Sequence, residues 1–293
     1  MTSSAYKPHR SALYLPANNA RAIEKARSID TDVLIFDLED AVSPQMKGAA
    51  RENLVAGFKA GGFGRSKCVL RVNHLDTAYF LDDLAVLSSC DFDAVLIPKV
   101  SQGATLERIA GHIRSMGLRK VPSLWAMIET PEALVNLNGI AEAGRGAEPP
   151  LECLIVGTND IAKETGVSMS DDRAYMLPWL MSIVLTAKRW GLTVLDGVWN
   201  DFRDLAGYEK ELRQAQKMGF DGKTLIHPSH VALANEVFAP SEAAIAEARA
   251  IVEAFQRPEN AGLGVINMDG KMVELLHLEM ARRLLSVQAG IAG

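Results

Sequence analysis

The stretch VLIFDLEDAV, residues 33–42, joins an apolar run to a cluster of acidic residues. Residues 33–36 form the kind of short run that a strand buried on both faces requires. Asp37, Glu39 and Asp40 follow immediately, although unpaired carboxylates repel one another and resist desolvation. We therefore interpret the stretch as a buried strand that presents acidic side chains at its carboxyl end.

Similar apolar runs recur along the chain and predict a closed barrel. The eight runs, all rich in Val, Ile and Leu, are 11–16, 32–37, 67–73, 93–99, 123–129, 152–157, 192–197 and 223–227. Segments with apolar residues at helical spacing separate them. Repeated β–α units predict a parallel sheet, and eight units favour a (β/α)8 TIM barrel over an open doubly wound sheet. The Gly-, Ala- and Pro-rich segment 141–150 is interpreted as a surface loop.

The composition indicates a folded protein and excludes several classes of partner. The 293 residues, 48% hydrophobic and 23% charged, argue against disorder. A net charge of −5 offers no basic surface for nucleic acid. No uncharged run approaches the roughly 18–20 residues of a membrane span. Three dispersed cysteines and a polar N-terminus without an apolar signal region lead us to expect a cytoplasmic protein without nucleic-acid or membrane partners.

The pattern changes after residue 238, which divides the chain into a catalytic barrel, 1–238, and a C-terminal helical extension, 239–293. Residues 240–256 predict a helix with Ser241 as its N-cap. Residues 262–272 predict an extended piece with a Gly turn, and a second helix follows. This extension must either cap its own barrel or cross to a neighbouring subunit.

Polar residues gather at the predicted carboxyl ends of the strands, where barrels of this type carry their chemistry. They are Asp37, Glu39, Asp40, Arg71, Asn73, Lys99, Glu129, Asp160, Asp196 and His227. Glu129 and Asp160 would stand on adjacent strands, so that one divalent cation could neutralise both. Oxygen donors without a His–Cys cluster favour Mg²⁺ or Mn²⁺ over zinc. The structural alternatives are an acid at a helix N-terminus for Glu129 and an N-cap for Asp160.

The remaining polar residues allow more than one role. Glu39 and Asp40 would hold metal-bound water, or belong to a solvated loop. Arg71 lies within an apolar strand and needs an anion, either a structural carboxylate such as Asp37 or a substrate oxyanion. Lys99 could bind phosphate or carboxylate, or form a Schiff base. His227 is either a catalytic base or, more in keeping with its place before a proline, a buried histidine that positions its loop.

Several of these stretches also carry a family resemblance. They are RSALYLPANNARAIEKA (10–26), DVLIFDLEDAVSPQMKGAAR (32–51), LRVN (70–73), MIET (127–130), GTNDIA (157–162), GFDGKTLIHPSH (219–230) and GVINMDGKMVE (264–274). Their order along nearly the whole chain resembles the citrate lyase β-subunit-like enzymes of the HpcH/HpaI aldolase family, related to malyl-CoA and citramalyl-CoA lyases. The resemblance implies a barrel of the phosphoenolpyruvate/pyruvate superfamily, dependence on Mg²⁺, a coenzyme A thioester substrate and a homotrimer or hexamer.

The resemblance also assigns roles to individual residues. They are metal ligation for Glu129 and Asp160, contacts with metal-bound water for Glu39 and Asp40, contact with the keto-acid fragment for Arg71, the CoA region for Arg10 and Lys25, and protonation of an enolate by Glu274 of a neighbouring subunit. Glu129 thereby also contacts the substrate, and Arg71, Asp40 and Glu274 form the catalytic set. Three positions depart from the usual family pattern: Ala17 replaces Gly, His230 replaces Gln and Glu274 replaces Asp.

The expected activity is a Mg²⁺-dependent, reversible Claisen-type cleavage of a 3-hydroxy-dicarboxylic acyl-CoA, such as citryl-, malyl- or citramalyl-CoA. It would yield an acyl-CoA and an α-keto acid. Three alternatives remain: a thioesterase on the same scaffold, a metal-free Schiff-base aldolase that uses Lys99, and a barrel subunit without catalytic activity.

Overall fold

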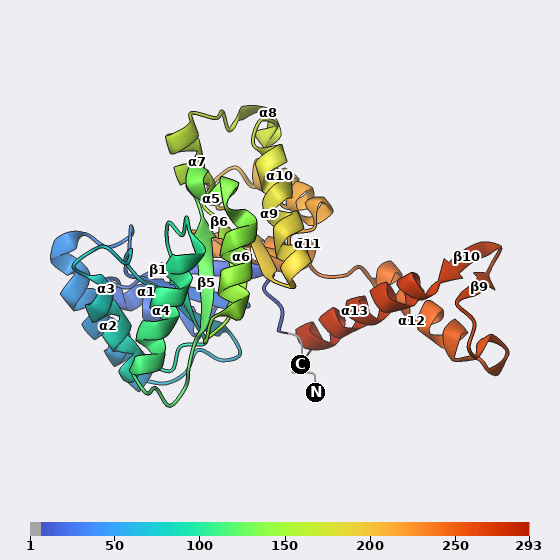
Figure 1. Cartoon of the computed structure of the whole chain (residues 1–293), viewed down its shortest axis with the longest axis horizontal. Coiled ribbons are helices and arrows are strands. Elements are labelled where there is room, and N and C mark those ends of the chain that lie inside the picture. Colours follow the sequence, from blue (N-terminus) through green and yellow to red (C-terminus); the bar gives the residue numbers. More distant parts are fainter. Residues whose placement is uncertain (1–6, 293) are drawn as a thin grey trace. The chain divides into compact units, whose positions relative to one another are not determined.

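The barrel predicted from the sequence is confirmed by the computed structural model, which describes residues 7–292. Eight parallel strands close on themselves in sequence order (Figure 1). They are β1 (Ser11–Pro16), β2 (Val33–Asp37), β3 (Lys67–Arg71), β4 (Ala94–Ile97), β5 (Ser123–Ile128), β6 (Leu151–Val156), β7 (Thr193–Asp196) and β8 (Gly222–Leu225). Each lies within a residue or two of its predicted start, and all carry their C-terminal residues to one edge of the barrel.

Helices connect the strands and cover the outside of the barrel. They are α1 (Ala20–Ala26), α2 (Lys47–Lys59), α3 (Phe80–Ala85), α4 (Gly103–Ser115), α5 (Pro131–Val135), α6 (Leu137–Gly146), α7 (Thr158–Thr165), α8 (Ser170–Arg173), α9 (Leu177–Trp190), α10 (Leu205–Met218) and α11 (Val231–Val237). A helix after each strand lets the next strand run parallel, which is the basis of the closed fold.

The interior of the barrel is a packed apolar core. Its buried side chains come from strands around the ring and include Ala12, Ile35, Val69, Leu96, Trp125, Met127, Ile155 and Leu195. Because neighbouring residues of a strand point to opposite faces, the other strand residues pack under the surrounding helices. Because the interior is filled, barrels of this kind carry their active sites at the carboxyl-end edge of the strands.

The prediction of a loop over 141–150 is wrong in its first half. Helix α6 continues to Gly146 and buries Ile140, Ala141 and Gly144. At Gly144 a Cβ atom would lie 2.7–2.8 Å from side-chain atoms of Leu106 and Leu151. The small residues that suggested a loop therefore allow close packing of α6 against its neighbours.

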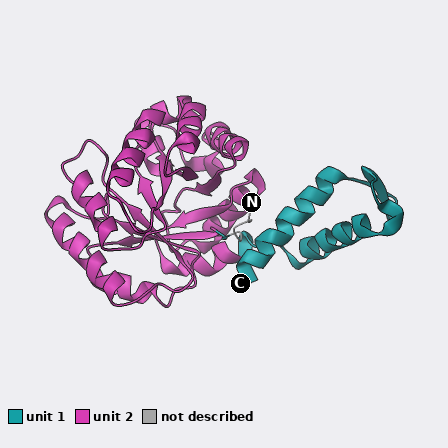
Figure 2. Cartoon of the chain, turned by 60° about the horizontal axis from the view of Figure 1, so that its bottom comes forward, with its two compact units in different colours: residues 1–8, 236–293 teal, residues 9–235 magenta. Residues whose placement is uncertain are grey.

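The chain divides into two compact units, one of residues 9–235 and one that contains 236–292 (Figure 2). The second unit holds α12 (Glu242–Gln256), the antiparallel hairpin β9 (Val265–Met268) and β10 (Lys271–Glu274), and α13 (Leu275–Ala292). Ser241 caps α12 as predicted, accepting from Ala244 N at 3.2 Å. Packing of this unit on a neighbouring subunit stays a prediction. No helix within residues 7–292 combines the length and apolarity needed to cross a bilayer.

Candidate active site

A cavity of about 460 Å³ lies at the carboxyl ends of the barrel strands. Titratable side chains from β1, β2 and β3 and from the segments after β2, β5 and β6 line it: Tyr14, Asp37, Asp40, Arg71, Glu129 and Asp160. This is the edge where TIM-barrel enzymes carry their chemistry. The structure thus brings together most of the acidic and basic residues that the sequence places at strand ends.

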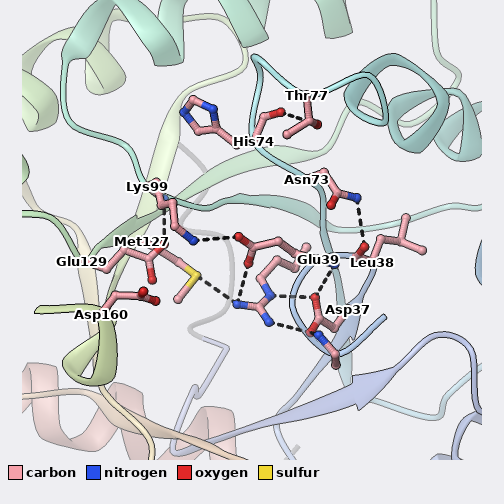
Figure 3. Close-up of polar contacts among 12 residues, drawn as sticks. Asp37, Leu38, Glu39, Asn73, His74, Thr77, Lys99, Met127, Glu129 and Asp160 are labelled. Carbon is pink, nitrogen blue, oxygen red and sulfur yellow. Dashed lines mark hydrogen bonds and ion pairs between the residues drawn. The ribbon is translucent and has the colours of Figure 1, made fainter. Parts of the chain in front are cut away.

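Glu129 and Asp160 enter this cavity from adjacent strands. Glu129 follows β5 directly, and Asp160 lies in the first turn of α7 after β6. Both line the cavity, and Figure 3 draws their carboxyl groups next to one another. Gly157 makes room for Glu129, because a Cβ there would lie 2.4 Å from Glu129 Oε2. The backbone around α7 is therefore shaped to accommodate the Glu129 carboxyl group.

The Glu129 carboxyl group lies in a site that is short of positive charge. Burial raises its pKa to about 7, and the negative charges of Glu39 and Asp160 also raise it. Lys99 opposes the shift through its positive charge and through its backbone N–H, which donates to Glu129 Oε1 at 2.7 Å. A buried carboxyl group with an elevated pKa beside a second acid is a common feature of functional sites.

The donor set fits a hard divalent cation. Within residues 7–292, no group of three or more His, Cys, Asp or Glu is placed to hold a metal. Mg²⁺ is usually held by one or two carboxylates while water and substrate complete its shell, whereas zinc takes three or four protein ligands. Glu129 and Asp160 therefore fit Mg²⁺ or Mn²⁺.

Arg71 is held by carboxylates on both sides. Its Nε and Nη2 donate to Asp37 Oδ1 and Oδ2 at 2.7 and 2.5 Å, and its Nη1 lies 2.9 Å from Glu39 Oε2 (Figure 3). Its guanidinium also stacks on the Tyr14 ring, 4.8 Å from the ring centroid. Burial alone would lower the pKa of Arg71, but Asp37 above all raises it, so Arg71 is a fixed cation. Asp37 is thus its structural partner, and Arg71 still lines the cavity.

Lys99 is an ion-pair partner with little nucleophilic character. Its Nζ lies 3.1 Å from Glu39 Oε1. Burial opposes its charged form, but Glu39 and Glu129 together raise the pKa of Lys99 above its ordinary value. A Schiff base requires a neutral amine, usually obtained by lowering this pKa. The electrostatics of the site therefore disfavour the metal-free aldolase.

Glu39 and Asp40 differ in their surroundings. Glu39 is buried between Arg71 and Lys99, and burial raises its pKa. Asp40 is exposed on the cavity wall. Contacts of either residue with metal-bound water stay predictions.

A scaffold that the sequence did not reveal holds the loop after β2. Lys47 Nζ donates to the carbonyl oxygens of Leu38 and Glu39 at 2.6 and 2.8 Å and to Asn73 Oδ1 at 2.8 Å. Asn73 in turn donates through its side-chain and backbone N–H groups to Asp83 Oδ2. A lysine and an aspartate in helical segments carry no sequence signal for this role. The scaffold fixes the backbone that carries Glu39.

Asp196 belongs to a separate buried cluster. Arg173, Asp196, Glu211 and Lys223, here called the sealed quartet, pair with each other at 2.6–3.1 Å. Asp196 and Lys223 are fully buried. Burial opposes ionisation of Asp196, but Lys223 and Arg173 lower its pKa below the ordinary value. The structure therefore gives this strand-end acid a structural role.

His227 is exposed, which makes the prediction of a buried histidine wrong. Its ring stacks on Phe202 at 5.0 Å between centroids, and Nδ1 lies 2.7 Å from Ser229 Oγ. The buried histidine is His230, which stacks on Tyr208 at 4.0 Å. Strand β8 ends at Leu225, two residues before the end predicted from the sequence. His227 therefore lies in the exposed segment after the strand.

Three residues with roles implied by the resemblance are not among those that line the cavity. Arg10 precedes β1, at the opposite end of the strand from the cavity, and forms a two-pronged ion pair with Asp32 at 2.7 and 2.8 Å. Lys25 is exposed on α1. Glu274 ends β10 in the second unit, where its backbone N–H donates to His277 Nδ1 at 3.0 Å. Their roles toward CoA and substrate stay predictions.

Similar proteins are found over nearly the whole chain. A (3S)-malyl-CoA thioesterase from Cereibacter sphaeroides is 43% identical over 285 residues, covering 97% of this chain and 96% of that protein. An L-malyl-CoA/beta-methylmalyl-CoA lyase from the same species is 30% identical and covers 94% and 93%.

Solved structures agree with this relationship. The CitE protein from Mycobacterium tuberculosis in complex with magnesium, acetoacetate and coenzyme A has a TM-score of 0.76 and 28% identity, covering 97% of this chain and 99% of that one. The citrate lyase beta subunit of the same organism, complexed with oxaloacetate and magnesium, has a TM-score of 0.66 and 28% identity, over 80% and 98%. Residues 10–228 match the family described as HpcH/HpaI aldolase/citrate lyase, and the chain belongs to that family.

Proposed function

We propose that the protein is a Mg²⁺-dependent enzyme that hydrolyses the thioester of a 3-hydroxy-dicarboxylic acyl-CoA, with malyl-CoA as the representative substrate. The observation that carries the proposal is the single cavity that contains Glu129, Asp160 and Arg71. Two acids suited to a hard cation and one fixed guanidinium match a substrate with several oxygen ligands and a negative charge. The 43% identity to a malyl-CoA thioesterase over 97% of the chain supports hydrolysis.

Glu129 and Asp160 would hold the cation, which when bound acts as a Lewis acid toward substrate oxygens. Arg71 would bind the carboxylate at the far end of the acyl group. Asp37 keeps the Arg71 guanidinium in place through two hydrogen bonds. Because the ion pairs that fix Arg71 exist before substrate arrives, no reorganisation of this cation is needed on binding.

Hydrolysis requires a base that faces the cavity and is free to accept a proton. Asp40 is exposed on the cavity wall, and we assign it this role. The water oxygen would bond to the thioester carbonyl carbon while Asp40 accepts a water proton. The C–S bond would then break, releasing CoA as the thiol after protonation and the hydroxy-dicarboxylic acid.

Cleavage of a carbon–carbon bond is the second candidate. It is favoured by the 30% identity to a malyl-CoA lyase and by the likeness to citrate lyase beta subunits. The same cavity would serve it, with Arg71 binding the keto-acid fragment. Glu274 of a neighbouring subunit would be the acid that protonates the acyl-CoA enolate.

The identity of the products separates the two reactions. With malyl-CoA and Mg²⁺, we expect free thiol and malate to appear in equal amounts, whereas a lyase yields acetyl-CoA and glyoxylate. Glu129→Gln should lower the rate more than about 100-fold, because even residues outside the ligand shell cost 10- to 100-fold at metal sites. Glu132→Gln is the matched control, since Glu132 is exposed on α5. Glyoxylate without malate would reject hydrolysis, and an active Glu129→Gln variant would reject the proposed site.

A further inference from the structure

One part of the cavity wall is built from three side chains on alternate strands. Tyr14 lies on β1, Arg71 on β3 and Met127 on β5, and all three line the cavity. Alternate strands of such a barrel contribute side chains to a common layer, which brings together residues that are distant in sequence. We call these residues the Tyr14–Arg71–Met127 layer.

Two strong hydrogen-bond donors in this layer share one weak acceptor. The Tyr14 hydroxyl donates to Met127 Sδ at 3.9 Å, and Arg71 Nη1 contacts the same sulfur at 3.7 Å. Tyr14 is half-buried on the cavity wall, and a thioether is a weak acceptor for its hydroxyl. The contact with Met127 therefore leaves the hydroxyl poorly satisfied.

We propose that Tyr14 determines substrate specificity: its hydroxyl, together with Arg71 Nη1, binds a carboxylate oxygen of the acyl group in place of Met127 Sδ. Hydrogen bonds to a charged oxygen are shorter and stronger than those between neutral groups. The methionine side chain has three rotatable bonds and can turn away from the donors without moving the strand. The inference deepens the proposed function and rests on it, because it requires an acyl group that ends in a carboxylate.

The layer then discriminates between classes of acyl-CoA. A substrate with a terminal carboxylate supplies the oxygen acceptor that the Tyr14 hydroxyl lacks, and Arg71 Nη1, which also lies 2.9 Å from Glu39 Oε2, can bind the same oxygen. A neutral acyl chain of similar length leaves the Tyr14 hydroxyl on the sulfur and gains no hydrogen bond from either donor. Sites built to hydrogen-bond a polar group reject analogues without it far more strongly than apolar pockets reject a missing methylene.

Binding of small carboxylates tests the layer without turnover. We would titrate the protein with glyoxylate and with L-malate by calorimetry in the presence of Mg²⁺, because these acids contain the carboxylate whichever reaction the protein catalyses. Tyr14→Phe keeps the ring against Arg71 and removes only the hydroxyl. Its Kd should rise about 10- to 100-fold, the usual loss for a hydrogen bond to a charged group, with an unchanged Tm.

Two further variants separate ligand binding from packing. Tyr208→Phe is the matched control, because the Tyr208 hydroxyl donates to the carbonyl oxygen of His230 at 3.1 Å and Tyr208 does not line the cavity. Its Kd should equal that of the wild type. Met127→Leu conserves volume and removes the sulfur, so its Kd should stay the same or fall, since the Tyr14 hydroxyl loses the acceptor that competes with the ligand.

Three outcomes would overturn the inference. They are a wild type that binds neither acid, a Tyr14→Phe variant with an unchanged Kd, and a Met127→Leu variant that weakens binding as much as Tyr14→Phe. A selective loss in Tyr14→Phe supports the inference even if malyl-CoA is not hydrolysed, and that combination would reject the proposed hydrolysis alone.

Discussion

Two buried ion clusters lie at the strand ends of this barrel, and they differ in their balance of charge. The sealed quartet matches Arg173 and Lys223 with Asp196 and Glu211. The second, here called the cavity cluster, comprises Asp37, Glu39, Arg71, Lys99 and Glu129, with three acids for two bases. A closed network that satisfies its own charges needs no ligand, whereas an excess of buried acid calls for a cation from outside.

The pKa values of the two clusters follow this difference. In the sealed quartet, burial opposes ionisation but Lys223 and Arg173 lower the pKa of Asp196. In the cavity cluster, burial and the neighbouring acid Glu39 raise the pKa of Glu129 to about 7. Asp196 and Glu129 are both carboxylic acids at or directly after the end of a strand. Asp196 thus stabilises the structure, whereas Glu129 belongs to the candidate site.

The largest expected effect is on the sealed quartet. Asp196→Asn would leave Arg173 and Lys223 facing Glu211 alone, and breaking a buried pair of this kind usually costs about 3–5 kcal/mol. Because the pKa of Asp196 is lowered on folding, its contribution is fully present above the unfolded pKa and is lost as pH falls through the folded pKa. Denaturant unfolding at neutral and at acidic pH measures both points. If Asp196→Asn were as stable as the wild type at neutral pH, the ion pairs of the sealed quartet would not stabilise the fold. The contrast with the cavity cluster would then not hold.

In the metal-free protein, replacing Glu129 should raise the free energy of unfolding, whereas replacing Asp196 lowers it. Its folded pKa of about 7 lies above the value of an unfolded glutamate, so its ionised form destabilises the fold at higher pH. Glu129→Gln should therefore be more stable than the wild type at pH 8 in EDTA. The difference should shrink as pH falls from about 7 to about 4.5. Thermal unfolding across this range measures it, and a variant that is less stable throughout would show that the Glu129 charge is already compensated.

The sequence predicted the positions of Asp196 and Glu129 but not the bases around them, although it did offer Asp37 as a partner of Arg71. All eight strands were located, because apolar runs of Val, Ile and Leu this short, separated by segments with helical spacing, favour buried strands over helices. Asp196 and Glu129 both follow such runs and look alike in sequence. Arg173 on α8 and Glu211 on α10, which distinguish them, lie in helices whose side-chain directions depend on the packed fold. Tertiary contacts between distant elements decide which acid is satisfied, and a strand pattern does not contain them.

The prediction of a loop over 141–150 failed for a related reason. Gly144 and Gly146 lower the helix propensity of 141–146, yet Gly144 lies where α6 packs closely against Leu106 and Leu151. Tertiary packing outweighs propensity at such positions. The scaffold around Lys47 was missed likewise, since its acceptors Leu38, Glu39 and Asn73 come from two other loops.

The smallest expected effect concerns Lys99, one of the two bases that offset the three acids of the cavity cluster. Lys99→Arg keeps a cation beside Glu39 and leaves the backbone N–H to Glu129 in place. The activity should fall less than about 10-fold, because partly exposed ion pairs contribute about 1 kcal/mol or less. Lys99→Met should lower it further, since Glu39 then relies on Arg71 alone. Steady-state rates with malyl-CoA at saturating Mg²⁺ measure both variants.

The same pair of variants decides the role of the Lys99 amine. If Lys99 acted through a Schiff base, Arg and Met would abolish activity equally, because neither side chain can form one. A graded loss, smaller for Arg than for Met, shows that its charge is what matters. Trapping with borohydride should then leave no adduct on the wild type. Equal loss in both variants together with an adduct would instead place Lys99 among the nucleophiles, and the excess of acid in the cavity cluster would need another explanation.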